Sequence, residues 1–111
     1  MDRLRTRSSF LAVQKQGQRV PGQRLVLYVL PRPLQERHER ARVGLVVSKK
    51  VGKAVVRNRV KRWLRECYRR LDPPAPAGMD VVIIARPSEA KSSYHQTAWE
   101  MAELMRRLGT P

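Results

Sequence analysis

The stretch VVRNRVKRWLRE, Val55 to Glu66, decides how the rest of this chain is interpreted. Six of its twelve side chains are basic or amide groups, and only one is acidic. With helical spacing, one side of the segment 56–71 is apolar and carries Val56, Val60, Trp63, Leu64, Cys67, Tyr68 and Leu71. The opposite side carries Asn58, Lys61, Arg62, Arg65 and Arg69, and the edges of the apolar stripe carry Arg57 and Arg59. The pattern predicts an amphipathic helix with one packed face and one cationic face.

The apolar face of such a helix must be covered, and the flanking sequence supplies strands that could cover it. Strand-forming residues dominate 24–31 (RLVLYVLP) and 42–48 (RVGLVVS), and 80–85 (DVVIIA) is typical of a buried strand. The strand 24–31 has large apolar side chains on both faces, which indicates cover on both sides. The polar segment 31–41 between the first two strands predicts a hairpin loop.

A short helix is predicted near the N-terminus. Ser8 or Ser9 can cap it, its apolar positions include Phe10 and Val13, and Gly17 can end it. Near the other end, Ser93 and Gln96 can form a capping box for a last helix.

The apolar stripe of that last helix consists of Tyr94, Ala98, Met101, Met105 and Leu108. The segment 72–78 (DPPAPAG) cannot continue a helix and makes a stiff connection. The predicted order is therefore α-β-β-(β)-α-β-α, an α+β fold in one domain that spans residues 1–111.

The charge of the chain points to a polyanionic partner. Lys and Arg number 24 against nine acidic residues, a formal charge of +15. Between Lys49 and Arg70 there are ten basic residues and one acid, Glu66, whereas a solvated helix face normally mixes both signs. Nucleic acid fits this pattern, and arginine suits RNA because its planar fork binds phosphate and stacks on bases. An anionic membrane is the competing partner, but that would need a lipid-facing helix edge or an anchor.

Several other classes of function are disfavoured. Gly52-Lys53 lacks the earlier glycine and the following Ser or Thr of a phosphate-binding loop. His38, His95 and Cys67 do not have metal-ligand spacing, and the acidic residues are scattered. We therefore expect no catalytic site, no metal site and no small-molecule substrate on this chain. One cysteine and an apolar run no longer than 25–30 indicate a cytoplasmic protein without a membrane span.

The aromatic side chains are few. Trp63 and Trp99 lie in predicted helices and are expected in the core. Phe10 lies beside a basic N-terminus, where it could pack in the core or stack on an unpaired base. The sequence leaves those two roles of Phe10 open.

At VGLVVSKKVGKAVVRNRVKRWLRE, Val43 to Glu66, the sequence closely resembles the bacterial ribonuclease P protein subunit. The strand, the SKK turn and RNR at the start of a basic helix occur together and in order, and the resemblance extends over nearly the whole chain. The family implies a small α/β sandwich with a left-handed β-α-β crossover, against the usual handedness. It also implies a catalytic RNA partner that uses bound Mg²⁺ to cut the 5′ leader from precursor tRNA, while the protein helps to hold the leader.

The resemblance implies roles for individual residues. The RNA-binding positions would be Lys49, Lys50, Lys53, Arg57, Asn58, Arg59, Lys61, Arg62, Arg65 and Arg69. Phe10 and Tyr28 would line the cleft for the leader. Where many relatives have a second aromatic residue one helical turn after Phe10, this chain has Gln14. That substitution puts stacking at this end of the cleft in question.

Two alternatives from other classes fit the charge. One is a non-enzymatic RNA chaperone or ribosomal protein, and the other is a DNA-binding protein that places the basic helix in a major groove. The RNR motif, in its position at the start of the basic helix, favours the ribonuclease P protein over both.

Overall fold

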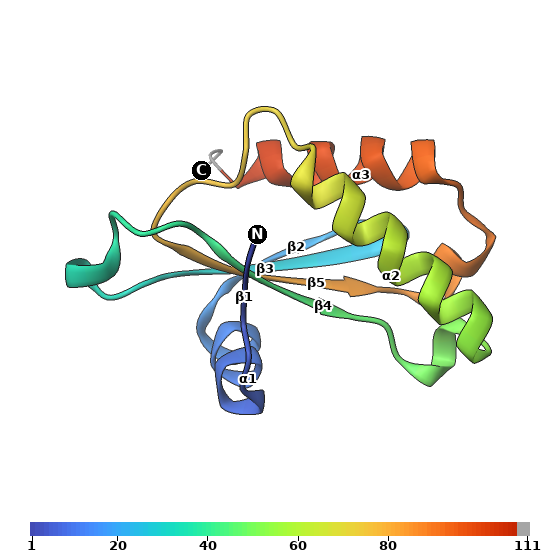
Figure 1. The fold of residues 1–111 in the computed structure, drawn as a ribbon, viewed down its shortest axis with the longest axis horizontal. Helices are drawn as coiled ribbons and strands as arrows, with labels where there is room; N and C mark the ends of the chain where they lie inside the picture. Colours follow the sequence, from blue (N-terminus) through green and yellow to red (C-terminus); the bar gives the residue numbers. More distant parts are fainter. Residues whose placement is uncertain (109–111) are drawn as a thin grey trace.

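A five-stranded mixed sheet forms the centre of the molecule, with the strands in the order β1-β4-β5-β3-β2 (Figure 1). The computed structural model describes residues 1–108. The strands are β1 (Asp2–Arg3), β2 (Gln18–Pro21), β3 (Leu25–Pro31), β4 (Arg42–Val46) and β5 (Met79–Ala85). β4 runs parallel to both β1 and β5, whereas β3 is antiparallel to β5 and β2.

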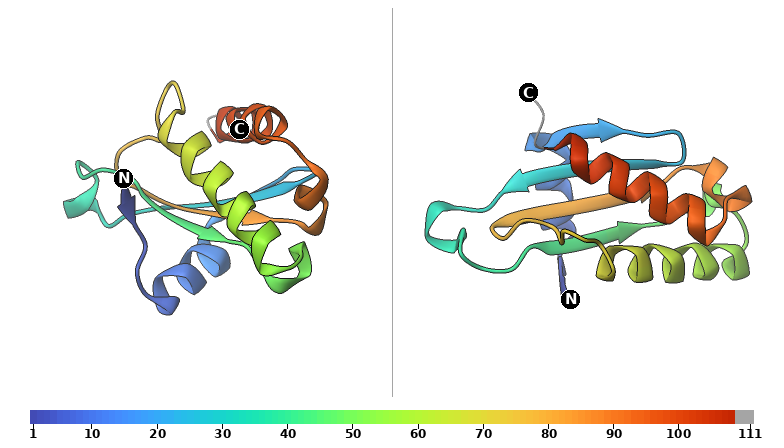
Figure 2. Two further views of the ribbon diagram at one scale, coloured as in Figure 1. Left: turned by 45° about the vertical axis from the view of Figure 1, so that its right-hand side comes forward. Right: turned by 90° about the horizontal axis from the view of Figure 1, so that it is seen from above.

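Helices cover both faces of the sheet, as the apolar character of both faces of β3 predicted. α1 (Arg7–Gln16) lies on one face, and α2 (Ala54–Arg69) and α3 (Tyr94–Arg107) lie side by side on the other (Figures 1 and 2). Short 3₁₀ turns precede α2 (η2, Lys49–Val51) and α3 (η3, Pro87–Lys91), and a third lies between β3 and β4 (η1, Leu34–Glu36). No helix within residues 1–108 is long and apolar enough to cross a membrane.

Successive side chains of each strand point to opposite faces of the sheet, and this produces two cores, one on each face. The larger one, between the sheet and α2 and α3, is built on Val43, Val60, Leu64, Val81, Ile83, Met101 and Leu104. The smaller one, under α1, contains Leu4, Val13 and Val82, with Phe10 and Tyr28 packed at its edge. The expectation that Trp99 is a core residue is wrong, since 68% of it is exposed. Two residues before the buried Met101, it lies on the outer side of α3.

The connection from β4 through α2 to β5 joins two adjacent parallel strands. In the right panel of Figure 2 the viewer looks down on α2 and α3, both strands run to the right, and β5 lies above β4. The chain therefore moves from β4 upward to β5 while α2 passes in front of the sheet. For strands that run to the right, this arrangement is a left-handed crossover. The family resemblance implied this hand, which is rare among such connections.

Three local expectations need correction. β3 and β4 do not form a hairpin, because β5 lies between them and pairs with both. Instead β3 forms a hairpin with β2, a strand that the sequence did not reveal. The N-cap of α1 is Thr6 rather than Ser8 or Ser9: the Ser9 backbone N–H donates to Thr6 Oγ1 at 3.2 Å, so the helix begins earlier.

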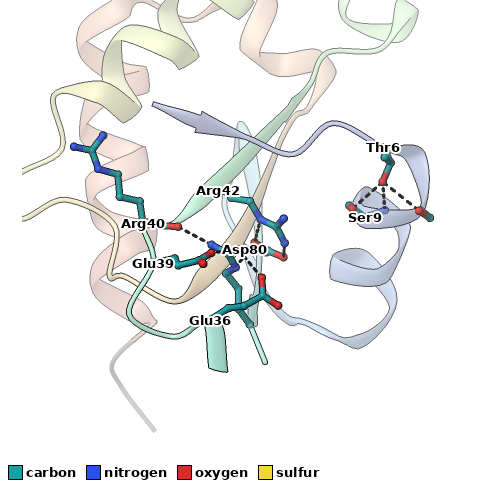
Figure 3. Close-up of polar contacts among 9 residues, drawn as sticks. Thr6, Ser9, Glu36, Glu39, Arg40, Arg42 and Asp80 are labelled. Atoms are coloured by element: carbon teal, nitrogen blue, oxygen red, sulfur yellow. Dashed lines mark hydrogen bonds and ion pairs between the residues drawn. The ribbon is translucent and has the colours of Figure 1, made fainter. Parts of the chain in front are cut away.

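The loop between β3 and β4 is held by a buried arginine, Arg32, whose partners Glu36, Glu39 and Arg40 are labelled in Figure 3. Arg32 Nη2 donates to Glu36 and Glu39, each at 2.7 Å, and Arg32 Nη1 donates to the Arg40 carbonyl at 3.0 Å. Next to it, Arg42 forms a two-point ion pair with Asp80 across β4 and β5, with both distances 2.8 Å. These acidic groups are therefore already neutralised by arginines.

Candidate nucleic-acid interface

The outer face of α2 is strongly cationic. Asn58, Lys61, Arg62, Arg65 and Arg69 are exposed there, while Val60, Leu64 and Cys67 are buried against the sheet. The amphipathic helix predicted from the sequence is thereby confirmed. Within residues 1–108, Lys61, Arg62 and Arg65 form no ion pair. Their charges are available to phosphate groups.

Three lysines extend this surface beyond the start of α2. Lys49 and Lys50 lie in η2 and Lys53 is the residue before α2, and all three are exposed. The face of α2 together with these lysines is named the basic face below. The end of the basic face near Arg69 is weaker, because Glu66 pairs with both Arg69 and Arg70. The hydrogen bond from Arg69 lowers the pKa of the Glu66 carboxyl, so this acid stays charged.

The two arginines of the RNR motif also hold the protein together, which sequence reasoning missed. Arg57 Nε donates to the Gly52 carbonyl at 3.1 Å, and Arg59 Nη2 donates to the Ala90 carbonyl at 2.9 Å. The Arg59 guanidinium also lies 5.1 Å from the centre of the Trp63 ring. Each guanidinium has five N–H groups, so both side chains keep donors for a ligand. They tie η2 and η3 to α2.

Phe10 and Tyr28 lie on the α1 side of the sheet, and a row of paired residues connects them. The register places Gly44 beside Val82, Val82 beside Tyr28, and Tyr28 beside Arg19. Phe10 projects from α1 onto Gly44: a Cβ atom built at Gly44 would stand 2.3 Å from Phe10 Cε1. The missing side chain at Gly44 therefore makes room for the ring. A glycine inside a strand signals such a close approach, and this signal was present in the sequence.

A cavity of about 340 Å³ joins Phe10 to the basic face. It lies along β4 beyond the short strand β1 and is lined by Arg3, Leu4, Phe10, Gly44, Lys61 and Arg65, among others. One side is aromatic and apolar, and the other is cationic. The fold thus brings together predicted leader-cleft and RNA-binding residues, and adds Arg3, which no sequence motif indicated.

The side chains that could bind a metal or react as nucleophiles do not form a second site in residues 1–108. In residues 1–108 no three His, Cys, Asp or Glu side chains gather where they could hold a metal ion. Burial raises the pKa of the Cys67 thiol to about 11, as befits a core side chain rather than a reactive one. The surface therefore combines exposed cations on α2 with two half-buried aromatic rings on the α1 side of the sheet.

The fold and this surface define a class: a small α/β sandwich with a cationic and aromatic surface suited to nucleic acid. Comparisons with known proteins identify the family. The family model described as Ribonuclease P matches residues 1–109. The Ribonuclease P protein component of Desulfovibrio desulfuricans is 44% identical over 108 residues, which cover 96% of this chain and 82% of that relative.

Solved structures agree with this result. The RNase P protein from Thermotoga maritima is 31% identical, with a TM-score of 0.82, and the match covers 96% of this chain and 97% of that one. The RNase P protein of Staphylococcus aureus is 25% identical, with a TM-score of 0.84 and coverage of 98% and 96%. The chain belongs to the ribonuclease P protein family. It is a protein component of the endoribonuclease that processes the 5′ end of tRNA.

Proposed function

We propose that this chain binds the catalytic RNA of ribonuclease P through its basic face and holds the 5′ leader of precursor tRNA against Phe10 and Tyr28. The observation that carries the proposal is the charge of Lys61, Arg62 and Arg65 on the outside of α2, which no ion pair within residues 1–108 neutralises. Lysines and arginines that lack acidic partners release counterions when they meet phosphates, and this release drives association.

Phe10 and Tyr28 suit an unpaired strand. Both rings are half-buried, so each is fixed by packing while part of it faces outward. A stacked ring accepts any base, whereas base-edge hydrogen bonds reject wrong ones. A protein that must accept many leader sequences needs this tolerance. Gln14, also half-buried, stands one turn after Phe10, so this cleft has fewer stacking positions than a cleft with two aromatics on α1.

Magnesium belongs to the RNA in this proposal. Six of the nine acidic side chains are paired with arginines, among them Asp80 with Arg42 and Glu36 with Arg32. A hard cation prefers several free carboxylate or carbonyl oxygens, so the side chains present do not fit a protein-held Mg²⁺. The protein's own contribution is positive charge and a strand-holding cleft.

The test compares precursor tRNA with mature tRNA. Dissociation constants are measured for the catalytic RNA alone and for the RNA with this protein, at one fixed salt concentration. We expect the protein to tighten binding of precursor tRNA more than binding of mature tRNA, because only the precursor carries a leader. An equal gain for both ligands would contradict the leader contact and leave only general charge neutralisation.

A further inference from the structure

Arg19 lies at the far end of the row that begins at Gly44, on the edge strand β2. It faces the α1 side of the sheet, because it is paired with Tyr28 and its Nε donates to Tyr28 Oη at 3.2 Å. Its neighbour Val20 points to the opposite face and is buried in the larger core. The direction of the Arg19 side chain is therefore set both by the strand and by the hydrogen bond.

The guanidinium of Arg19 is oriented but not neutralised. The side chain is exposed, and within residues 1–108 it forms no ion pair with a carboxylate. Only the Nε–H is used, which leaves the two terminal nitrogens for a ligand. A guanidinium held in this way presents a flat pair of donors that matches a phosphate group.

The row from Gly44 to Arg19 crosses the sheet from β4 to β2, and a bound single strand would follow the same line. From β4 to β2 there are three strand spacings, or roughly 14 Å. Along this line an incoming strand would meet the Phe10 ring above Gly44, then the Tyr28 ring, and then the Arg19 guanidinium. Aromatic rings followed by a cation are what a single strand needs, since its bases stack and its phosphates remain charged.

We propose that Arg19, positioned by the Tyr28 hydroxyl, binds a backbone phosphate of the 5′ leader at the end of the cleft away from the basic face. The proposal rests on the leader cleft proposed above and extends it. In this chain, which has Gln14 on α1, the β2 end of the cleft holds the leader by charge. The contact does not depend on the leader's base sequence, but it requires a leader long enough to reach β2.

The experiment measures binding of precursor tRNAs whose leaders are shortened one nucleotide at a time, with the protein assembled on the catalytic RNA. Wild type is compared with Arg19→Ala and with Arg107→Ala. Arg107 is a matched control, because it is exposed and contacts the Pro21 carbonyl of β2 from the opposite face. Both substitutions remove one positive charge beside the same strand.

For Arg19→Ala we expect about a two- to fivefold weaker affinity for long leaders, as for an exposed ion pair, and unchanged affinity for the shortest leaders and mature tRNA. The salt dependence for long leaders should fall by about 0.7, the value for one phosphate contact on a single strand. Tyr28→Phe keeps the ring and removes the hydroxyl. It should give a smaller loss with the same length dependence, and no additional loss when Arg19 is already alanine.

Two results would overturn the proposal. If Arg19→Ala and Arg107→Ala behave alike at every leader length, Arg19 contributes only to net charge. If Tyr28→Phe weakens binding equally with and without Arg19, the hydroxyl does not act through Arg19. Phe10→Ala, measured in parallel, tests the cleft itself: a leader-dependent loss there with none for Arg19→Ala defeats the Arg19 contact alone. No leader-dependent loss for Phe10→Ala defeats the cleft and the Arg19 contact together.

Discussion

Gly44 and Phe10 show how a single missing side chain arranges the site. The ring of Phe10 lies where a Cβ atom of residue 44 would be, so the strand and the helix approach more closely than two side chains would permit. The ring is then held at the entrance of the cavity that also reaches Lys61 and Arg65. One part of the ring packs and another part remains exposed, so the structure allows both of its possible roles, packing and stacking.

Phe10→Ala should weaken binding of precursor tRNA by about 1–3 kcal/mol if the ring stacks on a base. Mature tRNA should bind as before, because it has no leader. The check is the affinity of the assembled enzyme for both tRNAs, together with the melting temperature of the protein. If Phe10 were only a core anchor, the truncation would lower folding stability by about 3–5 kcal/mol and affect both tRNAs equally.

Glu89 is a second residue whose environment dictates its behaviour. It is fully buried, with Thr97 Oγ1 2.5 Å from its Oε2. The Thr97 hydroxyl also lies 2.9 Å from the Ser93 carbonyl, and its single proton can serve only one of these acceptors. Burial raises the pKa of the Glu89 carboxyl, and this outweighs the hydrogen bonds from Thr97 and Ser92, which lower it. The folded protein therefore favours the neutral acid.

The sign of the pH dependence follows from the raised pKa. The stability contributed by neutral Glu89 is fully present below the ordinary Glu pKa of 4.5, and it is lost as the pH rises through the higher folded pKa. Glu89→Gln stays neutral, so its thermal stability should fall less than that of wild type between about pH 4.5 and 8. Glu103→Gln, on the surface of α3, serves as the control. A variant that loses more stability than wild type toward pH 8 would show that the charged form is favoured.

At the scale of elements, one side of α2 packs in the core and the opposite side presents basic residues to solvent. Val60 and Leu64 are fully buried, so the helix is anchored in the core while its outer side stays free for RNA. Arg57 and Arg59 connect the helix to the turns before and beside it, which keeps the lysines of η2 in a fixed place relative to α2. Packing and these hydrogen bonds therefore hold the basic face in place in the protein alone.

Arg62→Ala and Arg65→Ala should each weaken binding of the catalytic RNA and reduce the salt dependence by about one for each phosphate that the arginine neutralises. Thermal stability should barely change, because both side chains are exposed and unpaired within residues 1–108. Binding titrations at several salt concentrations, with melting curves, check this. Arg69→Ala should have a smaller effect, since Glu66 already binds Arg69. A large drop in melting temperature with an unchanged salt dependence would assign the arginines a structural role.

For the whole molecule, the formal charge of +15 suits RNA binding, and six of the nine acidic side chains are paired with arginines. We therefore expect the protein to bind RNA and the RNA partner to carry out the cleavage. The protein alone should not cleave precursor tRNA, whereas adding it to the catalytic RNA should restore cleavage when Mg²⁺ is limiting. The reason is that its cations lower the repulsion between two RNAs that otherwise need metal ions to approach. Cleavage rates are measured for RNA, protein and both across a magnesium series. Activity of protein freed of RNA would refute this division.

The sequence by itself determined the features that depend on local periodicity. The two faces of α2, the strand β3 with cover on both sides, and the excess of charge without acidic partners are all visible at spacings of a few residues. The motif VGLVVSKKVGKAVVRNRVKRWLRE indicated the family, and the family implied the left-handed crossover.

Only the tertiary structure decided which distant segments meet. β5 lies between β3 and β4, and β2 joins β3, because strand order depends on long-range pairing that no local pattern encodes. The same long-range pairing puts Gly44 under Phe10 and Arg19 beside Tyr28, so the cleft and its far cationic end exist only once the sheet is formed.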